Sequence, residues 1–171
     1  MIIVKAMKKF SKQGQRSLAI WAAGCAGRVL PLFEKACPED GRPRKAITAC
    51  RAWVRTGVFR MADIRGASLA AHAAARKAKE DSPARFAARA AGQAVATAHV
   101  PQHAFGAAYY ALKAVAAASP ATAGVKLVRE LEWQTGHLPK NLRKAWQPQR
   151  LPKNLRSLFP GAAAGNRMKN R

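Results

Sequence analysis

Alanine-rich stretches of helical length, divided by short breaks of proline and glycine, dominate this sequence and leave few folds open to it. Alanine is the strongest helix former and a poor filler of sheet cores. Aromatic residues make up only 7% of the chain, whereas apolar residues make up 49%, which is enough to bury a core. A largely β fold and wholesale disorder are therefore both disfavoured. The sequence predicts an all-α protein.

Apolar residues recur at helical spacing, and proline, serine and glycine mark where helices start and stop. Six helices are predicted, at about 15–36, 42–55, 60–79, 83–98, from Pro101 to the Ser119–Pro120 break, and from that break to 135. Pro31 falls near the end of the first and is expected to kink or shorten it. Short connections join antiparallel neighbours. We therefore expect a compact bundle of five or six mostly antiparallel helices.

Two basic segments flank this predicted bundle. The sequence divides into an N-terminal extension, an Ala-rich bundle and a C-terminal tail, at 1–14, 15–136 and 137–171. Within the extension, 2–12 has the spacing of a short amphipathic helix. Within the tail, LPKNLR occurs twice, at Leu138–Arg143 and Leu151–Arg156. Each copy is predicted to form one helical turn whose apolar residues lay the tail over the bundle, and 160–171 to be disordered.

The net charge of +23 is concentrated at the two ends of the sequence. Six basic residues and no acidic residue precede Glu34, and nine basic residues and no acidic residue follow Glu132. Such ends attract polyanions, whether a nucleic-acid backbone or an anionic membrane, although they can equally be solvated tails. The residues expected to contact a polyanion are Lys5, Lys8, Lys9, Lys12, Arg16, Lys140, Arg143, Lys153 and Arg156.

The three cysteines are widely spaced and form no metal-ligand motif, which fits a reduced cytoplasmic protein. Cys25 and Cys50 fall on apolar helix faces, where a buried thiol is expected. The short apolar stretch before Cys25 is similar to a lipoprotein signal, but the helical pattern continues through it to Phe33. No uncharged apolar run reaches the roughly 18 residues of a transmembrane helix, so none is predicted.

No arrangement of residues typical of an enzyme is found in the sequence. It contains no phosphate-binding glycine loop, nucleophile elbow or HExxH zinc motif. His99 and His103 have the i, i+4 spacing of metal ligands, but Pro101 lies between them. A hydrogen-bonding role at a helix junction is therefore favoured over a metal site. We expect His72 to be an interior polar group, and we predict that the protein is not an enzyme and uses no cofactor or metal.

Five segments carry a family resemblance: Trp21–Glu34 (WAAGCAGRVLPLFE), Arg42–Ile47 (RPRKAI), Arg51–Trp53 (RAW), Ala90–His99 (AAGQAVATAH) and Gly106–Ala111 (GAAYYA). They are similar to the helices of the Imm-5-like putative immunity proteins, a family of small bacterial all-α proteins. The resemblance covers about residues 18–145. It implies a cytoplasmic protein that neutralises a cognate toxin by binding it, with no catalytic residue set. The chain departs from the family in its basic ends and in the extension at 2–12.

On this resemblance, polar side chains of the bundle are the candidates for contact with a toxin. Arg42 and Arg44 lie at the turn before the second predicted helix, and Arg85, Arg89 and Gln93 share one face of the fourth. Solvation or ion pairs with the few acidic residues are the alternative roles for these arginines. A protein of charge +23 complements a basic nuclease poorly, so the expected toxin has an acidic surface or is not a nuclease. The alternative function is non-specific, salt-dependent binding of nucleic acid through its phosphate backbone.

Overall fold

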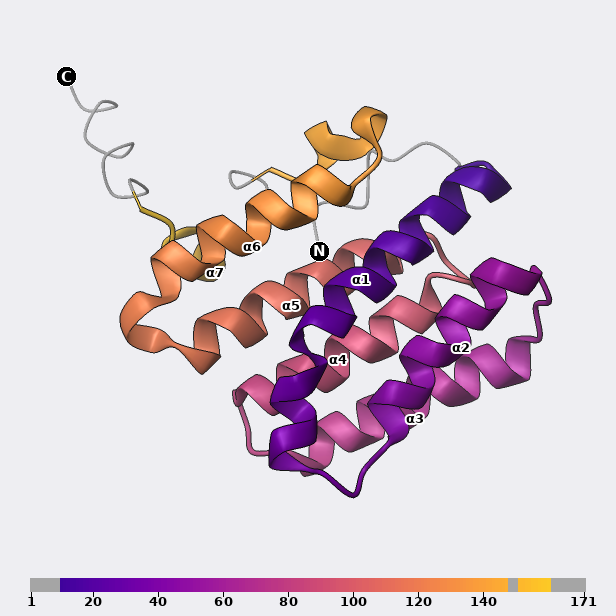
Figure 1. The fold of residues 1–171 in the computed structure, drawn as a ribbon, viewed down its shortest axis with the longest axis horizontal. Helices are drawn as coiled ribbons and strands as arrows, with labels where there is room; N and C mark the ends of the chain where they lie inside the picture. Colours follow the sequence, from indigo (N-terminus) through magenta and orange to yellow (C-terminus); the bar gives the residue numbers. More distant parts are fainter. Residues whose placement is uncertain (1–9, 148–150, 161–171) are drawn as a thin grey trace.

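A computed structural model describes residues 10–147 and 151–160 of the chain (Figure 1). Within those residues it contains helices, turns and loops but no strand, so the prediction of a compact all-α bundle is confirmed. The helices are α1 (Lys12–Ala36), α2 (Arg42–Thr56), α3 (Met61–Lys77), α4 (Pro83–Ala96), α5 (His103–Ala118), η1 (Pro120–Thr122), α6 (Ala123–His137), η2 (Lys140–Ala145) and α7 (Lys153–Arg156). The predicted amphipathic segment up to residue 9 and the tail from 161 lie outside the described residues.

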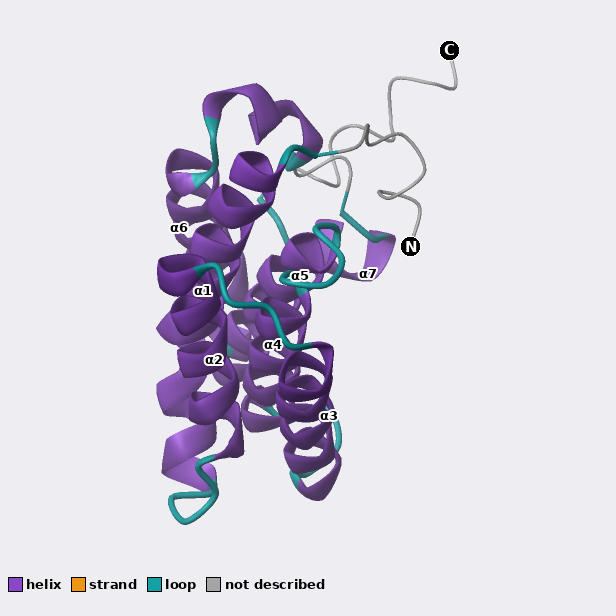
Figure 2. Ribbon diagram, turned by 90° about the vertical axis from the view of Figure 1, so that its right-hand side faces the viewer, coloured by secondary structure: helices purple, strands orange, loops and turns teal. Residues whose placement is uncertain are grey.

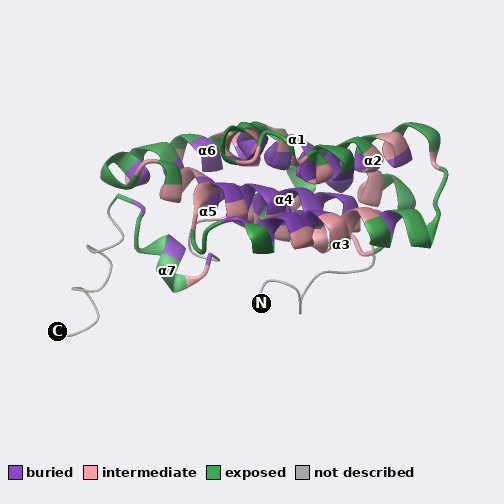
Figure 3. Ribbon diagram, turned by 90° about the horizontal axis from the view of Figure 1, so that it is seen from below, coloured by how far each residue is buried: buried purple, intermediate pink, exposed green. Residues whose placement is uncertain are grey.

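The long helices of the described residues pack in two layers of three. Figure 3 shows α6, α1 and α2 side by side in one layer, and α5, α4 and α3 in the other. α4 is the central helix of its layer and packs on α3 and α5 beside it and on α1 and α2 across the core. α1 is the central helix of the other layer, and α6 packs mainly on α5. Each layer therefore has one face that points away from the other layer. The central helix of that face is α1 in the first layer and α4 in the second.

Small side chains allow α4 to be enclosed by four neighbouring helices. Six of its buried residues are alanines, and helix axes approach closely where the contacting side chains are small. The bulky core side chains come from other helices: α1 supplies Leu18, Trp21 and Phe33, and α5 supplies Phe105 and Leu112. The abundance of alanine that predicts helices therefore also determines how closely they pack.

The first helix does not end early at Pro31. The sequence predicts a kink or a shortening there, and α1 continues through Pro31 to Ala36, where the helix is expected to end; the kink stays a prediction. Pro31 is exposed, so its ring faces solvent, while Leu30 and Phe33 on either side are buried. Burial of these two side chains offsets the backbone hydrogen bond that proline removes.

The sequence predicts that a serine followed by a proline caps the start of α4 and of α6, but only the serine before α4 does so. Ser82 caps α4 as predicted, because its hydroxyl accepts a hydrogen bond of 3.1 Å from the backbone N–H of Arg85. Ser119 does not cap α6: the chain first makes the 3-10 turn η1, and the hydroxyl of Ser119 instead accepts a hydrogen bond from Lys126 at 2.6 Å. Likewise, α5 begins at His103 and not at Pro101, after a turn.

The chain after α6 packs into the same core as the bundle. Trp146 is 1% exposed, and the centre of its ring lies 5.8 Å from the ring centres of both Trp21 and Phe105. Its indole N–H donates to Oε1 of the buried Gln134 at 2.8 Å, and the indole N–H of Trp21 donates to the backbone carbonyl of Gln134 at 2.7 Å. The amide of Gln134 donates to the carbonyl oxygen of Ala108 at 3.2 Å. One buried glutamine therefore links α1, α5, α6 and the tail.

The two copies of LPKNLR lie near opposite ends of α6. The first copy forms η2 directly after α6, and the second forms α7, on the α5 side of the bundle (Figure 2). The residues after α7 reach the start of α6, where a Cβ added to Gly124 would lie 2.8 Å from the carbonyl oxygen of Leu158. The buried apolar anchors of this segment are Leu138, Trp146, Leu151, Leu155 and Phe159. The basic residues of the two copies therefore do not form one patch.

Candidate partner-binding surface

The outer surface of α4 carries three of the residues that the sequence predicts for partner binding. Arg85, Arg89 and Gln93 are partly exposed, whereas most of the helix between them is buried. They are one helical turn apart and therefore lie on the same side of the helix. We call this strip, which runs along α4 between α3 and α5, the α4 face.

Aromatic side chains of α4 and α5 border the arginines of the α4 face. The guanidinium carbon of Arg89 lies 5.7 Å from the centre of the Tyr110 ring, and Tyr110 stacks on Phe86 with ring centres 6.4 Å apart. The ammonium of Lys113 lies 4.2 Å from the centre of the Phe86 ring. Cation–π contacts of this kind hold the cations in place. Tyrosine and arginine are also the residue types that dominate the binding energy of protein interfaces.

The arginines of the α4 face have no carboxylate partner among the described residues. All eight acidic side chains of the sequence lie between 34 and 132, inside the described part of the chain. The ion pairs found there are Arg28–Glu130, Arg42–Asp40 and Arg44–Glu34, and none involves α4. Arg85 and Arg89 are therefore half-buried charges without compensation. A surface of this kind favours a partner with matching negative charge.

A pocket of about 310 Å³ lies at one end of the α4 face, where α3, α4 and α5 meet; we call it the His–Gln pocket. It is lined by His72, Gln93 and His103, among others. Nδ1 of His103 lies 2.7 Å from Oε1 of Gln93, and because an amide oxygen only accepts, the imidazole donates this hydrogen bond. The helix-junction role expected for His103 is confirmed. Glycines make room for two side chains that line the pocket: a Cβ at Gly92 would lie 2.8 Å from His72, and one at Gly106 would lie 2.8 Å from Gln93.

Burial lowers the pKa of both histidines that line the pocket on α3 and α5. For His72 burial is the largest cause, followed by the positive charges of Arg89 and Arg76 and by His103. For His103 burial is again the largest cause, followed by His99. Both imidazoles are therefore neutral at pH 7. Protonation would add charge to a surface that already carries uncompensated arginines.

The lowered pKa values predict that the protein becomes less stable as the pH falls below neutrality. An unfolded histidine binds a proton near its ordinary pKa of about 6.5, while folded His72 and His103 resist protonation until a lower pH. Because the unfolded chain then binds more protons, the free energy of unfolding decreases as the pH falls through this window. Urea unfolding at pH 7.5 and pH 5.5 measures the decrease.

The pair of variants His72→Gln and His103→Gln, combined in one chain, should flatten this pH dependence. His137→Gln is the matched control, since His137 is exposed on α6 and its removal leaves both pocket histidines in place. A double variant that loses stability between pH 7.5 and 5.5 as steeply as the unmodified chain would contradict the assignment.

Arg42 and Arg44 lie at the start of α2, away from the α4 face, and each is held by a carboxylate. Nε of Arg42 donates to Oδ1 of Asp40 at 2.8 Å, and Arg44 forms two hydrogen bonds to Glu34 at 2.6 and 2.8 Å. The hydrogen bond from Arg42 is the largest cause that lowers the pKa of the Asp40 carboxyl. These pairs reduce the charge that the two arginines offer to a partner, and their role in partner binding stays a prediction.

The residues predicted to bind a polyanion are dispersed in the described structure. Lys5, Lys8 and Lys9 lie outside the described residues. Lys12, Lys140, Lys153 and Arg156 are exposed, and Arg16 covers Gly57 at the end of α2. Arg143 instead has a structural contact, because its guanidinium donates to the carbonyl oxygens of Leu138 and Gly136 at the end of α6. Polyanion binding by this set stays a prediction.

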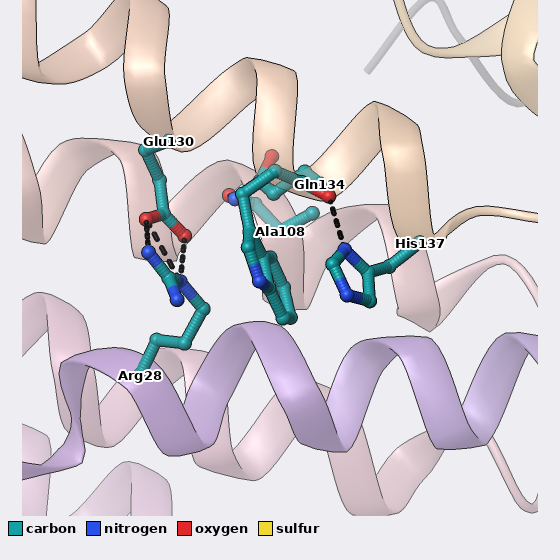
Figure 4. Close-up of polar contacts among 6 residues, drawn as sticks. Arg28, Ala108, Glu130, Gln134 and His137 are labelled. Carbon is teal, nitrogen blue, oxygen red and sulfur yellow. Dashed lines mark hydrogen bonds and ion pairs between the residues drawn. The ribbon is translucent and has the colours of Figure 1, made fainter.

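A partly buried ion pair between α1 and α6 is not predicted from the sequence. Figure 4 shows Arg28 of α1 reaching Glu130 of α6, with its Nε 3.1 and 3.0 Å from the two carboxylate oxygens. Glu130 is only 5% exposed, and the Arg28 guanidinium lies 4.3 Å from the centre of the Trp133 ring. Trp133 in turn stacks on His137, with ring centres 4.1 Å apart. The one available signal was the position of Glu130 next to Leu131 on the apolar stripe of α6.

Removal of Arg28 should destabilise the fold, because it leaves the Glu130 carboxylate buried without a partner. We expect Arg28→Ala to lower the free energy of unfolding by about 1–3 kcal/mol, less than for a fully buried pair because the Arg28 side chain is 41% exposed. Arg44→Ala breaks a more exposed pair and should change stability much less. Urea unfolding of both variants tests this, and equal effects would contradict the assignment.

The two core cysteines lie in unreactive surroundings, and the described residues include no cluster of metal ligands. Cys25 and Cys50 are buried free thiols. Burial raises the pKa of the Cys25 thiol well above its usual range, and it raises the pKa of the Cys50 thiol to about 12. Buried thiols with a raised pKa are poor nucleophiles. Among the described residues, no three or more histidine, cysteine or acidic side chains are placed to hold a metal ion. The helices in the described part of the chain are all too short or too polar to span a membrane.

Comparison with known proteins identifies the family to which this arrangement belongs. The family model described as Imm-5 like putative immunity protein matches residues 8–141, which include α1 to α6 and the whole α4 face. The chain matches no curated protein and no solved structure. The segment with Trp146 and α7 lies beyond the matched region. The chain belongs to the family of Imm-5 like putative immunity proteins.

Proposed function

We propose that this protein is a cytoplasmic immunity protein that binds a bacterial toxin and blocks it without catalysis. Family membership supports an immunity role. The observation that locates the toxin-binding surface concerns Arg85 and Arg89. Both arginines are half-buried and have no carboxylate partner in the described structure, and Arg89 lies beside Tyr110. An acidic surface of the toxin would supply the missing negative charge.

The rigidity of α4 supports binding through its outer face. The helix is packed on four neighbours, and Arg89 is held over Tyr110. Little conformational freedom is therefore lost when these side chains are immobilised at an interface. The mechanism we propose is occlusion: the α4 face covers an acidic cleft or substrate-binding surface of the toxin, which excludes the toxin's substrate by contact and charge.

The arginines on the other layer have a smaller role in this proposal. Arg42 and Arg44 are ion-paired within the chain, which reduces the charge that they offer to a partner, so they contribute less to the contact than Arg85 and Arg89 do. The basic ends act by long-range attraction and raise the rate of encounter with an acidic toxin.

Affinity purification from the native cells tests the proposal. The tagged full chain is recovered at low and high salt, with and without nuclease treatment. A protein partner that is still recovered after nuclease treatment, and that inhibits cell growth when it is expressed alone, as a toxin does, would support the immunity function. Recovery of nucleic acid alone, lost at high salt, would overturn it in favour of non-specific phosphate binding.

A further inference from the structure

The His–Gln pocket has an apolar rim that the α4 face itself lacks. Met61 is 43% exposed and Leu69 is 56% exposed, and both line the pocket. Val58 and Phe59, which are 61% and 43% exposed, precede Met61 at the turn between α2 and α3. Four of the seven large exposed apolar side chains of the described residues therefore lie on α3 or on the turn before it. Exposed apolar side chains beside a pocket suit contact with a partner.

The interior of the pocket is polar and offers hydrogen-bond donors. Because Oε1 of Gln93 accepts from His103, the amide nitrogen of Gln93 is left to donate, and no partner for it is found among the described residues. His72 carries one ring N–H when neutral, and Arg65 adds a guanidinium at the rim. The hydroxyl of Ser68 already donates to the carbonyl oxygen of Gly92 at 3.0 Å. The available donors suit an acceptor group on the ligand.

The charges around the pocket have one sign. Arg65 lines it from α3, and His99 and His103 line it from the α4–α5 turn and α5. The positive charges of Arg76 and Arg89 lie close enough to His72 to contribute to its lowered pKa. No aspartate or glutamate is among the residues that line the pocket. Gly92 on α4 and Gly106 on α5 leave room for the side chains of His72 and Gln93, which line the pocket. A larger residue at either glycine would displace these polar groups.

We propose that the His–Gln pocket receives an aspartate or glutamate side chain of the toxin, and that a neighbouring apolar side chain of the toxin packs on Met61 and Leu69. The inference rests on the proposed function and specifies the chemistry of the contact: an acidic residue next to a large apolar one. A carboxylate between His72 and His103 favours their protonated forms, so binding takes up protons and tightens as the pH falls from 8 to 6.

A dipeptide titration tests the pocket without the toxin. The probes are N-acetyl-leucyl-aspartate amide and N-acetyl-leucyl-asparagine amide, added to the full chain while the histidine ring signals are followed by NMR. We expect the aspartate probe to shift the signals of His72 and His103 saturably and to bind about tenfold more tightly than its amide analogue, because it adds a charge-assisted hydrogen bond. Its affinity should be higher at pH 6 than at pH 8.

Two variants make the result specific. Arg65→Gln should weaken the aspartate probe severalfold, and since Arg65 is exposed the fold does not depend on it. Arg51→Gln is the matched control on the opposite layer and should have no effect. Equal binding of both probes, equal effects of both variants, or shifts spread over the whole basic surface would overturn the proposal. If a toxin is captured but the dipeptide fails, only the pocket is refuted; if no toxin is captured, the immunity function is refuted.

Discussion

Charge reversal at Arg89 is expected to weaken toxin binding by on the order of 100-fold or more, because juxtaposed like charges cost several kcal/mol at an interface. Arg89 is half-buried at the middle of the α4 face, lies over Tyr110 and has no carboxylate partner in the described structure. In Arg89→Glu the toxin's acidic surface would meet a carboxylate where it now meets a guanidinium. Calorimetric titration with the captured toxin measures the loss.

Arg51→Glu is the matched control for this charge reversal. Arg51 is exposed on α2, in the opposite layer, so the variant changes the net charge by the same amount without altering the α4 face. It should reduce the affinity only through long-range attraction, and the reduction should shrink with added salt. Equal losses of affinity in both variants would show that overall charge, and not the α4 face, governs binding.

The largest effect on stability is expected for Trp146→Ala, at about 3–5 kcal/mol, the usual loss for removal of a buried tryptophan. Trp146 is 1% exposed, contacts Trp21 and Phe105, and donates to the buried Gln134. Its loss would leave a cavity between α1 and α5 and an unsatisfied amide oxygen. Urea unfolding measures the change in the free energy of unfolding.

Two further variants separate the causes of this loss. Trp146→Phe keeps most of the ring but removes the hydrogen bond to Gln134, and should cost about 1–3 kcal/mol. Leu158→Ala changes a 44% exposed residue of the same segment and should alter stability by less than about 0.5 kcal/mol. A cost below about 1 kcal/mol for Trp146→Ala would mean that the segment after α6 is not part of the core, contrary to its burial in the structure.

Periodicity and helix caps predict the elements of this fold well because both are local properties of the chain. Ser82 and Pro83 locate the start of α4 through a cap that involves only neighbouring residues. The helix does not end at Pro31, because the effect of a proline depends on what its neighbours bury, and Leu30 and Phe33 are both in the core. The layer order and the place of Trp146 depend on contacts between distant segments, which periodicity does not encode.

The candidate site is predictable in part for the same reason. Helical spacing places Arg85, Arg89 and Gln93 on one side of a helix, and the structure brings them together. The sequence cannot show that Arg42 and Arg44 are ion-paired while Arg85 and Arg89 are not, since that depends on where the few carboxylates lie. It also gives little sign of the pocket, because Gly92 and Gly106 create the space for side chains of other helices.

Growth of cells that express the captured toxin is the most direct test of the central claim, that the α4 face neutralises a toxin. The account predicts that co-expression of the unmodified protein, or of Arg51→Glu, restores growth. A chain with both Arg85→Glu and Arg89→Glu, present at the same level in the cells, should not restore growth. Protection by this double variant equal to that of the unmodified protein would contradict the account.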